Sequence, residues 1–461
     1  MCQWCLSNLN MKKVVKKIAI VSGYGNAGGG VARAIIEMEQ WFKKNDIDTQ
    51  IYSYESPYVF QRTQNIDAKE IKHSTIKRVS NEINKKFDAV VFHSFPDKKY
   101  KPRSLKAFHK FLKHIKIKKI SFTHRSTMHS INREAMIIPY LNEMDLIYVF
   151  GPNGYLGKYA EKFLKSKKIG KRIKKLILWF NFDEYDNFFN NPYEKRQRRV
   201  IYAGRYAGCK HTENVIDVCG DLHQLDNTIK QEMHGVVGTM AVKNKIFSNK
   251  YCIRKGKKDV VQEKGCVEVY RSYKRENILP IFSNSLFTIS LFYVDKETSG
   301  RLEYSHMEAI SCGCVLIADK EWADNYIMKD GVKCSDHKNC VLTVDKNNIL
   351  EEDLKKIIEV ANNKELFDEY RNNMFQLIKN EFDVNIVMSD ILKDINKVTV
   401  DTKKHKSTRE IIEYATKNKK YVDVYDKHKN RIVVLTPLQF KKKQFTVLSK
   451  TKQKIIKQFS S

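Results

Sequence analysis

The residues with the clearest chemistry stand where a loop enters a helix and a strand follows. The segment Gly300–Cys314 contains this loop and helix, and the apolar run Val315–Ala318 comes directly after it. Backbone amides at the start of a helix favour an anion such as a diphosphate, and a carboxylate one turn further in can accept hydrogen bonds from two ribose hydroxyls. We expect Glu308 to contact the ribose of a nucleotide. The other binding residues expected in this loop are Tyr304, Ser305 and His306.

A Gly-rich turn at residues 23–30 is the second candidate for phosphate binding. It follows the apolar run Ile18–Ser22, opens a helix and satisfies the G-x-G-x-x-G spacing, so its amides can face a phosphate. We expect Gly28 and Gly29 to contact this anion. The same motif fits an oxidoreductase, although no acidic residue clearly ends a second strand to hold a nicotinamide ribose. A tight turn without any ligand is a further alternative.

His124 closes another apolar run, Ile120–His124. Side chains at the carboxyl ends of parallel strands point toward the ligand cleft, where an imidazole can hold a substrate or relay a proton. A lone histidine can equally be structural.

Short apolar runs separated by amphipathic segments are typical of a parallel sheet covered by helices. Two such sets predict an α/β chain of two doubly wound domains, residues 12–190 and 198–396, with Asn190–Arg199 as the linker. Ligands should bind in the cleft between them. Residues 401–461 form a small basic appendage, with 17 Lys and Arg against 5 Asp and Glu. The expected strands are Ile18–Ser22, Ala89–Ser94, Ile120–His124, Leu146–Phe150, Leu176–Phe180, Val200–Gly204, Val267–Tyr270, Phe287–Tyr293, Val315–Ala318 and Val341–Val344.

The 461 residues carry 84 Lys and Arg against 53 Asp and Glu, a formal net charge of +31. This excess favours a polyanionic partner, nucleic acid before an anionic membrane surface. A Lys-rich composition with no partner implied is the alternative. The segments Lys98–Lys119, which contains Tyr100, Phe108 and Phe111, and Lys165–Lys175 are the candidate DNA-binding clusters.

Ten cysteines are scattered through the chain with no secretory leader, which favours a reducing cytoplasm. The pairs Cys2/Cys5 and Cys312/Cys314 lack a second pair at zinc-like spacing, so no metal site is expected. Asp183–Asp186 is interpreted as a solvated turn and not as a metal motif. No apolar stretch approaches the roughly 18 residues of a membrane span.

The segment Arg301–Gly313 resembles the DNA alpha-glucosyltransferases of T-even phages, where a Leu-Glu-Tyr-Thr-His-Leu-Glu pattern precedes a Cys-Gly turn. The resemblance is colinear over about residues 17 to 396 and does not extend to residues 401–461. The other matching segments are the Gly-rich turn leading to Glu39–Phe42, Ser94–Pro96, the His124 segment, and Gly204-Arg205 with Lys210.

This resemblance implies the GT-B fold, two facing Rossmann-like domains with a central cleft. It further implies a retaining enzyme that moves a sugar, most simply glucose, from a UDP-sugar to 5-hydroxymethylcytosine in double-stranded DNA. The family uses two cations near the donor diphosphate, so no metal or other cofactor should be required. Residues expected in catalysis are His124, Arg205, Lys210 and Glu303; Arg205, Lys210 and Glu303 would also bind the donor. The enzyme is expected to act as a monomer in the cytoplasm of an infected bacterium, without a membrane partner.

Two departures from the family pattern leave alternatives open. Arg301 stands where GT-B transferases carry a glutamate seven residues before Glu308, and Arg125 replaces the aspartate after the family's histidine. Another sugar or base, a GT-B enzyme that acts on a cell-surface glycan or lipid, and a DNA-binding relative without catalysis all remain compatible with the sequence.

Overall fold

The chain folds into two compact units in the computed structural model. One comprises the residues up to Leu178 together with those from Asn385 onward, and the other runs from Trp179 to Val384. The residues that the structure describes are 14–22, 30–54, 67–93, 95, 102–123, 140–141, 143–150, 173–176, 178–206, 210–237, 240–255, 260–261, 263–271, 273–291, 302–400, 422–426 and 431–435.

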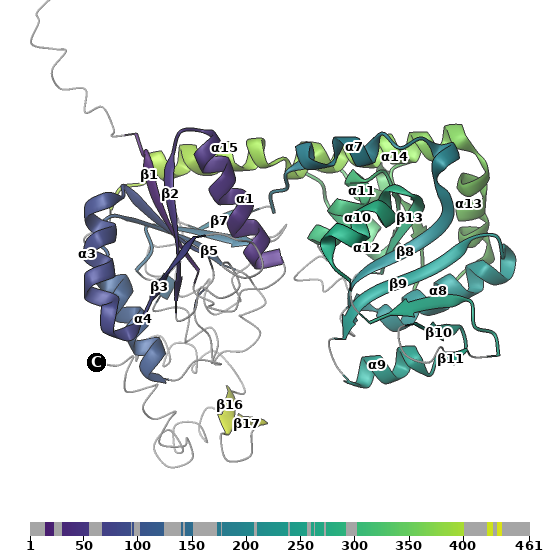
Figure 1. Ribbon diagram of the computed structural model, residues 1–461, viewed down its shortest axis with the longest axis horizontal. Coiled ribbons are helices and arrows are strands. Elements are labelled where there is room, and N and C mark those ends of the chain that lie inside the picture. Colours follow the sequence, from purple (N-terminus) through teal and green to yellow (C-terminus); the bar gives the residue numbers. More distant parts are fainter. Residues whose placement is uncertain are drawn as a thin grey trace, which may run out of the picture. The chain divides into compact units, whose positions relative to one another are not determined.

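The first unit is built on a seven-stranded parallel sheet of order β3-β2-β1-β4-β5-β6-β7. Helix α1 covers one face, and α3 and α4 pack together on the other (Figure 1). Its strands are β1 (Lys17–Ser22), β2 (Asp48–Tyr54), β3 (Ala68–Ile71), β4 (Ala89–His93), β5 (Lys118–Thr123), β6 (Leu146–Phe150) and β7 (Ile173–Leu176). Its helices are α1 (Gly30–Lys44), α3 (Ile76–Lys86) and α4 (Pro102–His114).

An aromatic cluster joins α4 to the first sheet. Phe108 and Phe111 of α4 are fully buried and pack edge-on against Phe92 of β4, with ring centroids 6.2 Å away in both cases. Phe95 and Tyr140 pack against Phe108. The expectation that Phe108 and Phe111 belong to a DNA-binding surface is therefore wrong, because an amphipathic helix places its apolar residues on one face, and that face fills the core.

The second unit has an eight-stranded sheet of order β11-β10-β12-β9-β8-β13-β14-β15. All strand pairs are parallel except β10 with β11. Helices α8 and α9 contact one another, as do α10 and α11 (Figure 1). Its strands are β8 (Gln197–Tyr206), β9 (Lys230–Val237), β10 (Cys252–Arg254), β11 (Val260–Val261), β12 (Val267–Tyr270), β13 (Ser285–Ser290), β14 (Val315–Asp319) and β15 (Leu342–Val344). Its longer helices are α8 (Thr212–Leu225), α9 (Met240–Phe247), α10 (Arg275–Ser283), α11 (Tyr304–Ser311), α13 (Glu351–Asn362) and α14 (Lys364–Phe382).

Both sheets reverse their direction of winding beside the first strand of the unit, between β1 and β4 and between β8 and β13. In open α/β sheets the ligand crevice forms outside the carboxyl ends of the strands at such a reversal. The α/β, doubly wound architecture expected from the apolar runs is thus confirmed. In the second unit, the residues that follow β8 and β13 therefore lie where a ligand crevice is expected.

Two short boundaries differ from those expected. The strand expected at Leu176–Phe180 is wrong in position, because β7 ends at Leu176 and Phe180 pairs with Asp383 as an isolated bridge of the second unit. The segment expected as the linker, Asn190–Arg199, lies inside the second unit, and its Arg196 is buried. This run of charged residues is not a solvated linker, because the Arg196 guanidinium donates hydrogen bonds to backbone carbonyls.

Helix α15 (Val384–Lys397) belongs almost entirely to the first unit, although it follows α14 of the second. Trp41 Nε1 donates to Asn385 Oδ1 at 3.0 Å, and the Tyr148 hydroxyl donates to Asp394 Oδ2 at 2.6 Å. The Val15 amide donates to Asn396 Oδ1 at 2.8 Å. The chain therefore returns to its first unit before residue 400, whereas the sequence assigned everything up to 396 to the second domain.

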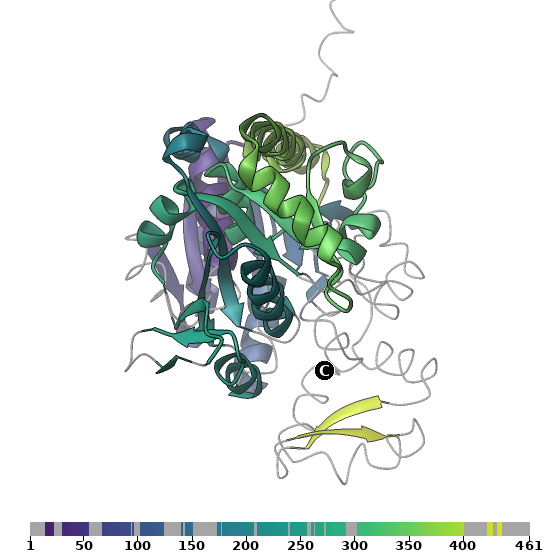
Figure 2. The same ribbon diagram turned by 90° about the vertical axis from the view of Figure 1, so that its right-hand side faces the viewer.

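Beyond residue 400 the structure describes one antiparallel pair, β16 (Val422–Asp426) and β17 (Arg431–Leu435), yellow in Figure 2. Both strands fall in the basic appendage. Among the described residues, no helix combines the length and the apolar character needed to cross a membrane.

Candidate functional site

Helix α11 and its N-cap residue carry half of the expected site residues. The helix starts at Tyr304 after the N-cap residue Glu303, near the reversal between β8 and β13. The Glu303 side chain does not cap the helix; its carbonyl instead accepts hydrogen bonds from the amides of His306 and Met307 at 3.0 and 3.1 Å. The positive end of the α11 dipole thus lies at the carboxyl edge of the sheet, a position that favours an anion.

Lys210 forms an ion pair with Glu303. Lys210 follows β8 and is largely buried, whereas Glu303 is partly exposed and precedes α11. The two residues lie 93 positions apart in the sequence, and the parallel pairing of β8 with β13 brings their segments together. The structure therefore unites two of the expected site residues, a cation and a carboxylate.

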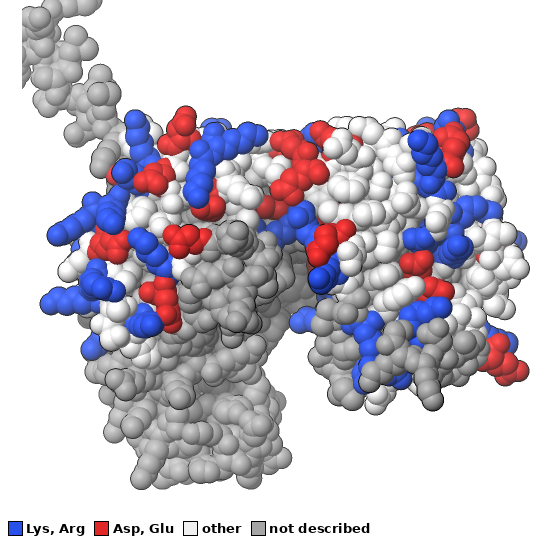
Figure 3. Space-filling model, viewed as in Figure 1, with Lys and Arg blue, Asp and Glu red and all other residues white. Residues whose placement is uncertain are grey.

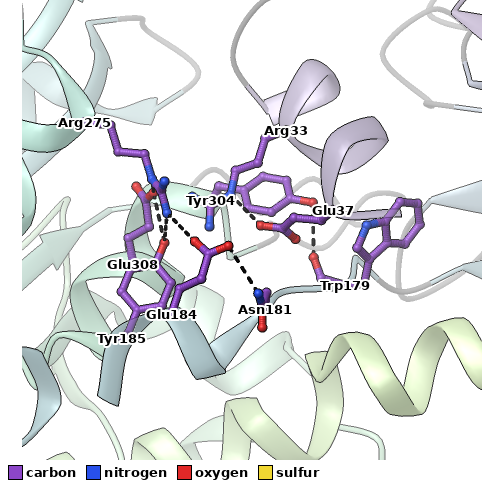
Figure 4. A network of polar contacts seen from close by, with 9 residues as sticks. All are labelled: Arg33, Glu37, Trp179, Asn181, Glu184, Tyr185, Arg275, Tyr304 and Glu308. Atoms are coloured by element: carbon purple, nitrogen blue, oxygen red, sulfur yellow. Dashed lines mark hydrogen bonds and ion pairs between the residues drawn. The ribbon is translucent and has the colours of Figure 1, made fainter. Parts of the chain in front are cut away.

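Glu308 is a buried carboxylate of α11 and is held by a polar network (Figure 4). Arg275 Nε donates to Glu308 Oε1 at 2.7 Å, and the Tyr185 hydroxyl donates to the same oxygen at 3.3 Å. Arg275 Nη2 also donates to the Tyr185 hydroxyl at 2.6 Å and to Glu184 Oε2 at 3.0 Å. The Glu308 carboxylate, which is only 6% exposed, is thus paired with a guanidinium.

Tyr273 connects the two carboxylates electrostatically. Burial, together with the charges of Glu308 and Glu303, raises the pKa of its phenol to about 12. The neutral hydroxyl therefore remains available as a hydrogen-bond donor at every physiological pH.

His306 is fully buried on the same helix. Burial lowers the pKa of its imidazole to about 3, and the nearby charge of Lys210 contributes in the same direction. The ring is consequently neutral near pH 7 and can offer one donor and one acceptor, but no positive charge, to a sugar or phosphate.

The depressed pKa of His306 predicts acid sensitivity. The unfolded chain binds a proton at this residue below about pH 6.5, whereas the folded protein does so only near pH 3. The contribution of His306 to stability is complete above pH 6.5 and is lost as the pH falls toward 3. Between pH 7 and 4.5 the free energy of unfolding of the wild-type protein should fall by about 2–3 kcal/mol more than that of His306→Gln. Urea unfolding of both proteins at the two pH values measures this difference. An identical pH dependence of the two proteins would contradict this assignment.

The remaining donor-loop residues are placed as follows. Tyr304 is buried, and its hydroxyl donates to the Trp179 carbonyl at 3.1 Å. Ser305 is partly exposed at the start of α11. Arg205 is exposed at the carboxyl end of β8, one residue before its last. In the described part of the chain its guanidinium makes no hydrogen bond or ion pair, and so none with Lys210. Arg205 is assigned to the site only because it lies at the same edge of the sheet.

Several expected site residues lie outside the described residues. These are Gly28 and Gly29 of the Gly-rich turn and His124; the two departures from the family pattern, Arg125 and Arg301, lie outside the described residues as well. Their roles remain predictions from the sequence.

The sequence interpretation missed the residues that hold Glu308. Tyr185 was assigned to a solvated turn, but it is 1% exposed within a short helical segment, Phe182–Tyr185. Nothing in the acidic run around it signals burial. Arg275 and Tyr273, in contrast, follow the expected strand Val267–Tyr270, so inspection of every strand's carboxyl end would have found them.

A second buried cluster lies at the end of β14. Lys346 Nζ donates to Asp319 Oδ2 at 2.6 Å and to Glu321 Oε2 at 3.0 Å. Asn214, in the first turn of α8, donates to the Lys346 carbonyl at 3.0 Å. This cluster therefore ties the first turn of α8 to the sheet through Asn214, four residues after Lys210.

The turn after α11 carries two cysteines. Cys312 and Cys314 are buried thiols, and Cys314 Sγ donates to the Phe282 carbonyl at 3.1 Å. Burial raises the pKa of Cys314 to about 12. No group of three or more His, Cys, Asp and Glu suited to a metal ion occurs among the described residues.

Similarity to known proteins is found in structure and not in sequence. No protein-family model matches the chain, and no curated protein is similar to it. It resembles an alpha-glucosyltransferase in complex with UDP and a 13-mer DNA containing an HMU base, with a TM-score of 0.68 and 17% identity over 83% of this chain and 100% of that one.

Two other glycosyltransferase structures share the architecture. An alpha-glucosyltransferase in complex with UDP-glucose and DNA containing an abasic site has a TM-score of 0.68 at 16% identity, over 82% of this chain and 98% of that one. A glycosyltransferase from Rickettsia africae ESF-5 has a TM-score of 0.58 at 15% identity, over 83% of this chain and 100% of that one. These likenesses, together with the two doubly wound sheets, show that the chain has the GT-B fold.

Proposed function

We propose that the protein is a UDP-sugar-dependent glycosyltransferase that modifies DNA, and that it moves glucose to 5-hydroxymethylcytosine with retention of the anomeric configuration. The observation that carries the proposal is the arrangement on α11. One short helix at the sheet reversal presents Glu303 with Lys210, and Glu308 with Arg275, beside its own amino end. The structural likeness to alpha-glucosyltransferases with UDP and DNA supports the choice of donor and acceptor.

The proposed reaction needs cations where negative charge develops. The acceptor hydroxyl oxygen forms a bond to the anomeric carbon while the bond to the UDP oxygen breaks, and the leaving group takes the electron pair. The hydroxyl proton passes to the departing diphosphate. Arg205 and Lys210 would stabilise this charge, which is the task a divalent metal performs in other transferases. Transfer should therefore proceed in the presence of EDTA.

Glu308 would hold the ribose of the donor. A carboxylate has about four acceptor sites, so one oxygen can be fixed by Arg275 and Tyr185 while the group accepts ribose hydroxyls. Arg275 is then a positioning residue, because it acts on the ribose through Glu308. The 48% exposure of its side chain means that the ion pair by itself contributes little to stability.

Replacement of Arg275 by alanine should reduce discrimination between UDP and 2′-deoxy-UDP. Without the guanidinium the Glu308 carboxylate loses its orientation, so UDP affinity should fall roughly tenfold while 2′-deoxy-UDP affinity changes less. Calorimetric titration of both nucleotides measures the ratio. Lys274→Ala removes a neighbouring exposed cation of the same charge and should leave the ratio unchanged. An unaltered ratio in Arg275→Ala would argue against ribose binding by Glu308.

The function itself is tested by nucleoside mass spectrometry. Duplex DNA with 5-hydroxymethylcytosine, unmodified duplex DNA and a lipid extract are each incubated with the protein and a panel of UDP-sugars. A hexose added only to the hydroxymethylated nucleoside supports the proposal. Sugar on lipid alone would instead identify a glycan or lipid transferase, and UDP-sugar neither bound nor hydrolysed would indicate a relative without catalysis.

A further inference from the structure

Two arginines of the second unit share the ring of Phe247. Arg254 ends β10 and Arg271 follows β12, its parallel neighbour in the sheet. Their guanidinium carbons lie 4.9 and 5.4 Å from the centroid of the Phe247 ring. This arginine pair, Arg254 and Arg271, is therefore held on one aromatic platform at the carboxyl edge of the sheet.

The arginine pair has no counterion within the described part of the chain. The Nε atoms of both residues are buried there without a hydrogen-bond partner, and neither guanidinium forms an ion pair. The nearby carboxylate of Glu268 is engaged by Lys255 at 3.2 Å and by the Tyr270 hydroxyl at 2.7 Å. Two like charges that are partly desolvated and uncompensated would be relieved by an anion from outside the chain.

The segment that carries the arginine pair is also cationic. Residues 240–275 contain 11 Lys and Arg against 3 Asp and Glu. Lys245 of α9 and Lys250 after it are exposed. Figure 3 shows Lys and Arg side chains gathered at this end of the second unit, where Figure 1 labels α9 and β10. Such a surface fits a chain of phosphates better than a single small anion.

We propose that the arginine pair binds a backbone phosphate of duplex DNA, so that the second unit contacts the acceptor as well as the donor. The inference rests on the proposed DNA acceptor. The planar guanidinium matches phosphate oxygens in two-pronged hydrogen bonds, and the Phe247 ring keeps both groups oriented. The pair lies two and three strands from β8, about 10–14 Å along the sheet, away from the diphosphate assigned to Lys210. The uracil base of the donor is uncharged, so it would not need two cations as partners.

The test compares the double variant Arg254→Gln/Arg271→Gln with wild-type full-length protein. An unmodified duplex is the probe, without donor, and its affinity is measured by fluorescence anisotropy from about 50 to 200 mM salt. The variant should bind DNA on the order of tenfold more weakly, and the slope of log K against log salt should fall by about 1–2. Its UDP affinity and its thermal unfolding should match those of wild type.

A matched control removes the same charge from the opposite edge of the same sheet. Lys230 begins β9 and Lys338 precedes β15, and both are exposed. Lys230→Gln/Lys338→Gln should retain most of the DNA affinity. If both double variants lose the same DNA affinity, the loss follows from net charge alone, and the proposal is overturned. Unchanged DNA binding, or weaker UDP binding with DNA binding intact, would overturn it as well.

These outcomes are separable from failure of the proposed function. DNA binding is measured without transfer, so absence of sugar transfer to DNA leaves the comparison of the two double variants intact. Conversely, transfer to hydroxymethylated DNA with no effect of the arginine pair would reject only this inference.

Discussion

Arg205→Ala is expected to lower the turnover number for sugar transfer by roughly 10²–10³, with a much smaller change in KM for the UDP-sugar. Arg205 is exposed at the carboxyl end of β8, beside the sheet reversal, and no carboxylate in the described residues engages it. It is therefore available for the oxygen that departs from the sugar. A cation that acts mainly on charge formed during bond cleavage stabilises the transition state more than the bound donor.

Steady-state transfer to hydroxymethylated DNA measures this effect, with Lys230→Ala as the control for loss of one exposed cation at the opposite sheet edge. Arg205→Lys should recover part of the rate, because it restores the charge but not the planar fork. Near wild-type turnover in Arg205→Ala would remove this residue from the mechanism and leave Lys210 as the proposed cation.

Gly313→Ala is expected to destabilise the second unit by about 3 kcal/mol. Gly313 ends the turn after α11 with a φ of +86°, in the left-handed region that disfavours a Cβ atom. An added Cβ would clash with the Arg196 guanidinium, lying 3.0 Å from its Cζ, and would lie 3.2 Å from the Phe189 carbonyl. Both the backbone conformation and the packing oppose the substitution.

Arg196 cannot move away cheaply. It is 7% exposed and donates to the carbonyls of Asn191 at 3.0 Å, Ser285 at 3.1 Å and Cys312 at 3.0 Å. Burial lowers the pKa of its guanidinium, yet these hydrogen bonds keep the charge satisfied. A shift of Arg196 would also disturb the end of α11, and with it the position of Glu308.

Gly331→Ala is the matched control for this prediction. Gly331 has a φ of +87°, and an added Cβ would meet nothing within 4 Å. Its substitution should cost about 1–2 kcal/mol, the conformational penalty alone. Urea unfolding of both variants separates the two contributions. If Gly313→Ala and Gly331→Ala lower the free energy of unfolding equally, Arg196 moves aside without an energetic cost.

Local sequence patterns sufficed for the parallel strands that are buried at every position. Runs such as Ala89–His93 and Val315–Asp319 are buried at every position, so nearly continuous apolar residues identify them without knowledge of their neighbours. The strand Asp48–Tyr54 contains polar residues and was not expected. Pairing with β1 and β3 makes it a strand, and local propensity does not reveal such pairing.

By itself, then, the sequence determined the α/β class and the presence of two sheets. It also determined the placement of Glu303 and Glu308 at the start of a helix. These features depend on residues that are close together in the chain. Only the tertiary structure decided which groups surround those carboxylates. Lys210, Tyr185 and Arg275 lie 93, 123 and 33 residues from their partners, and the folding of the second unit brings them together. The return of α15 to the first unit likewise depends on contacts such as Tyr148 with Asp394, 246 residues apart, which no local pattern encodes.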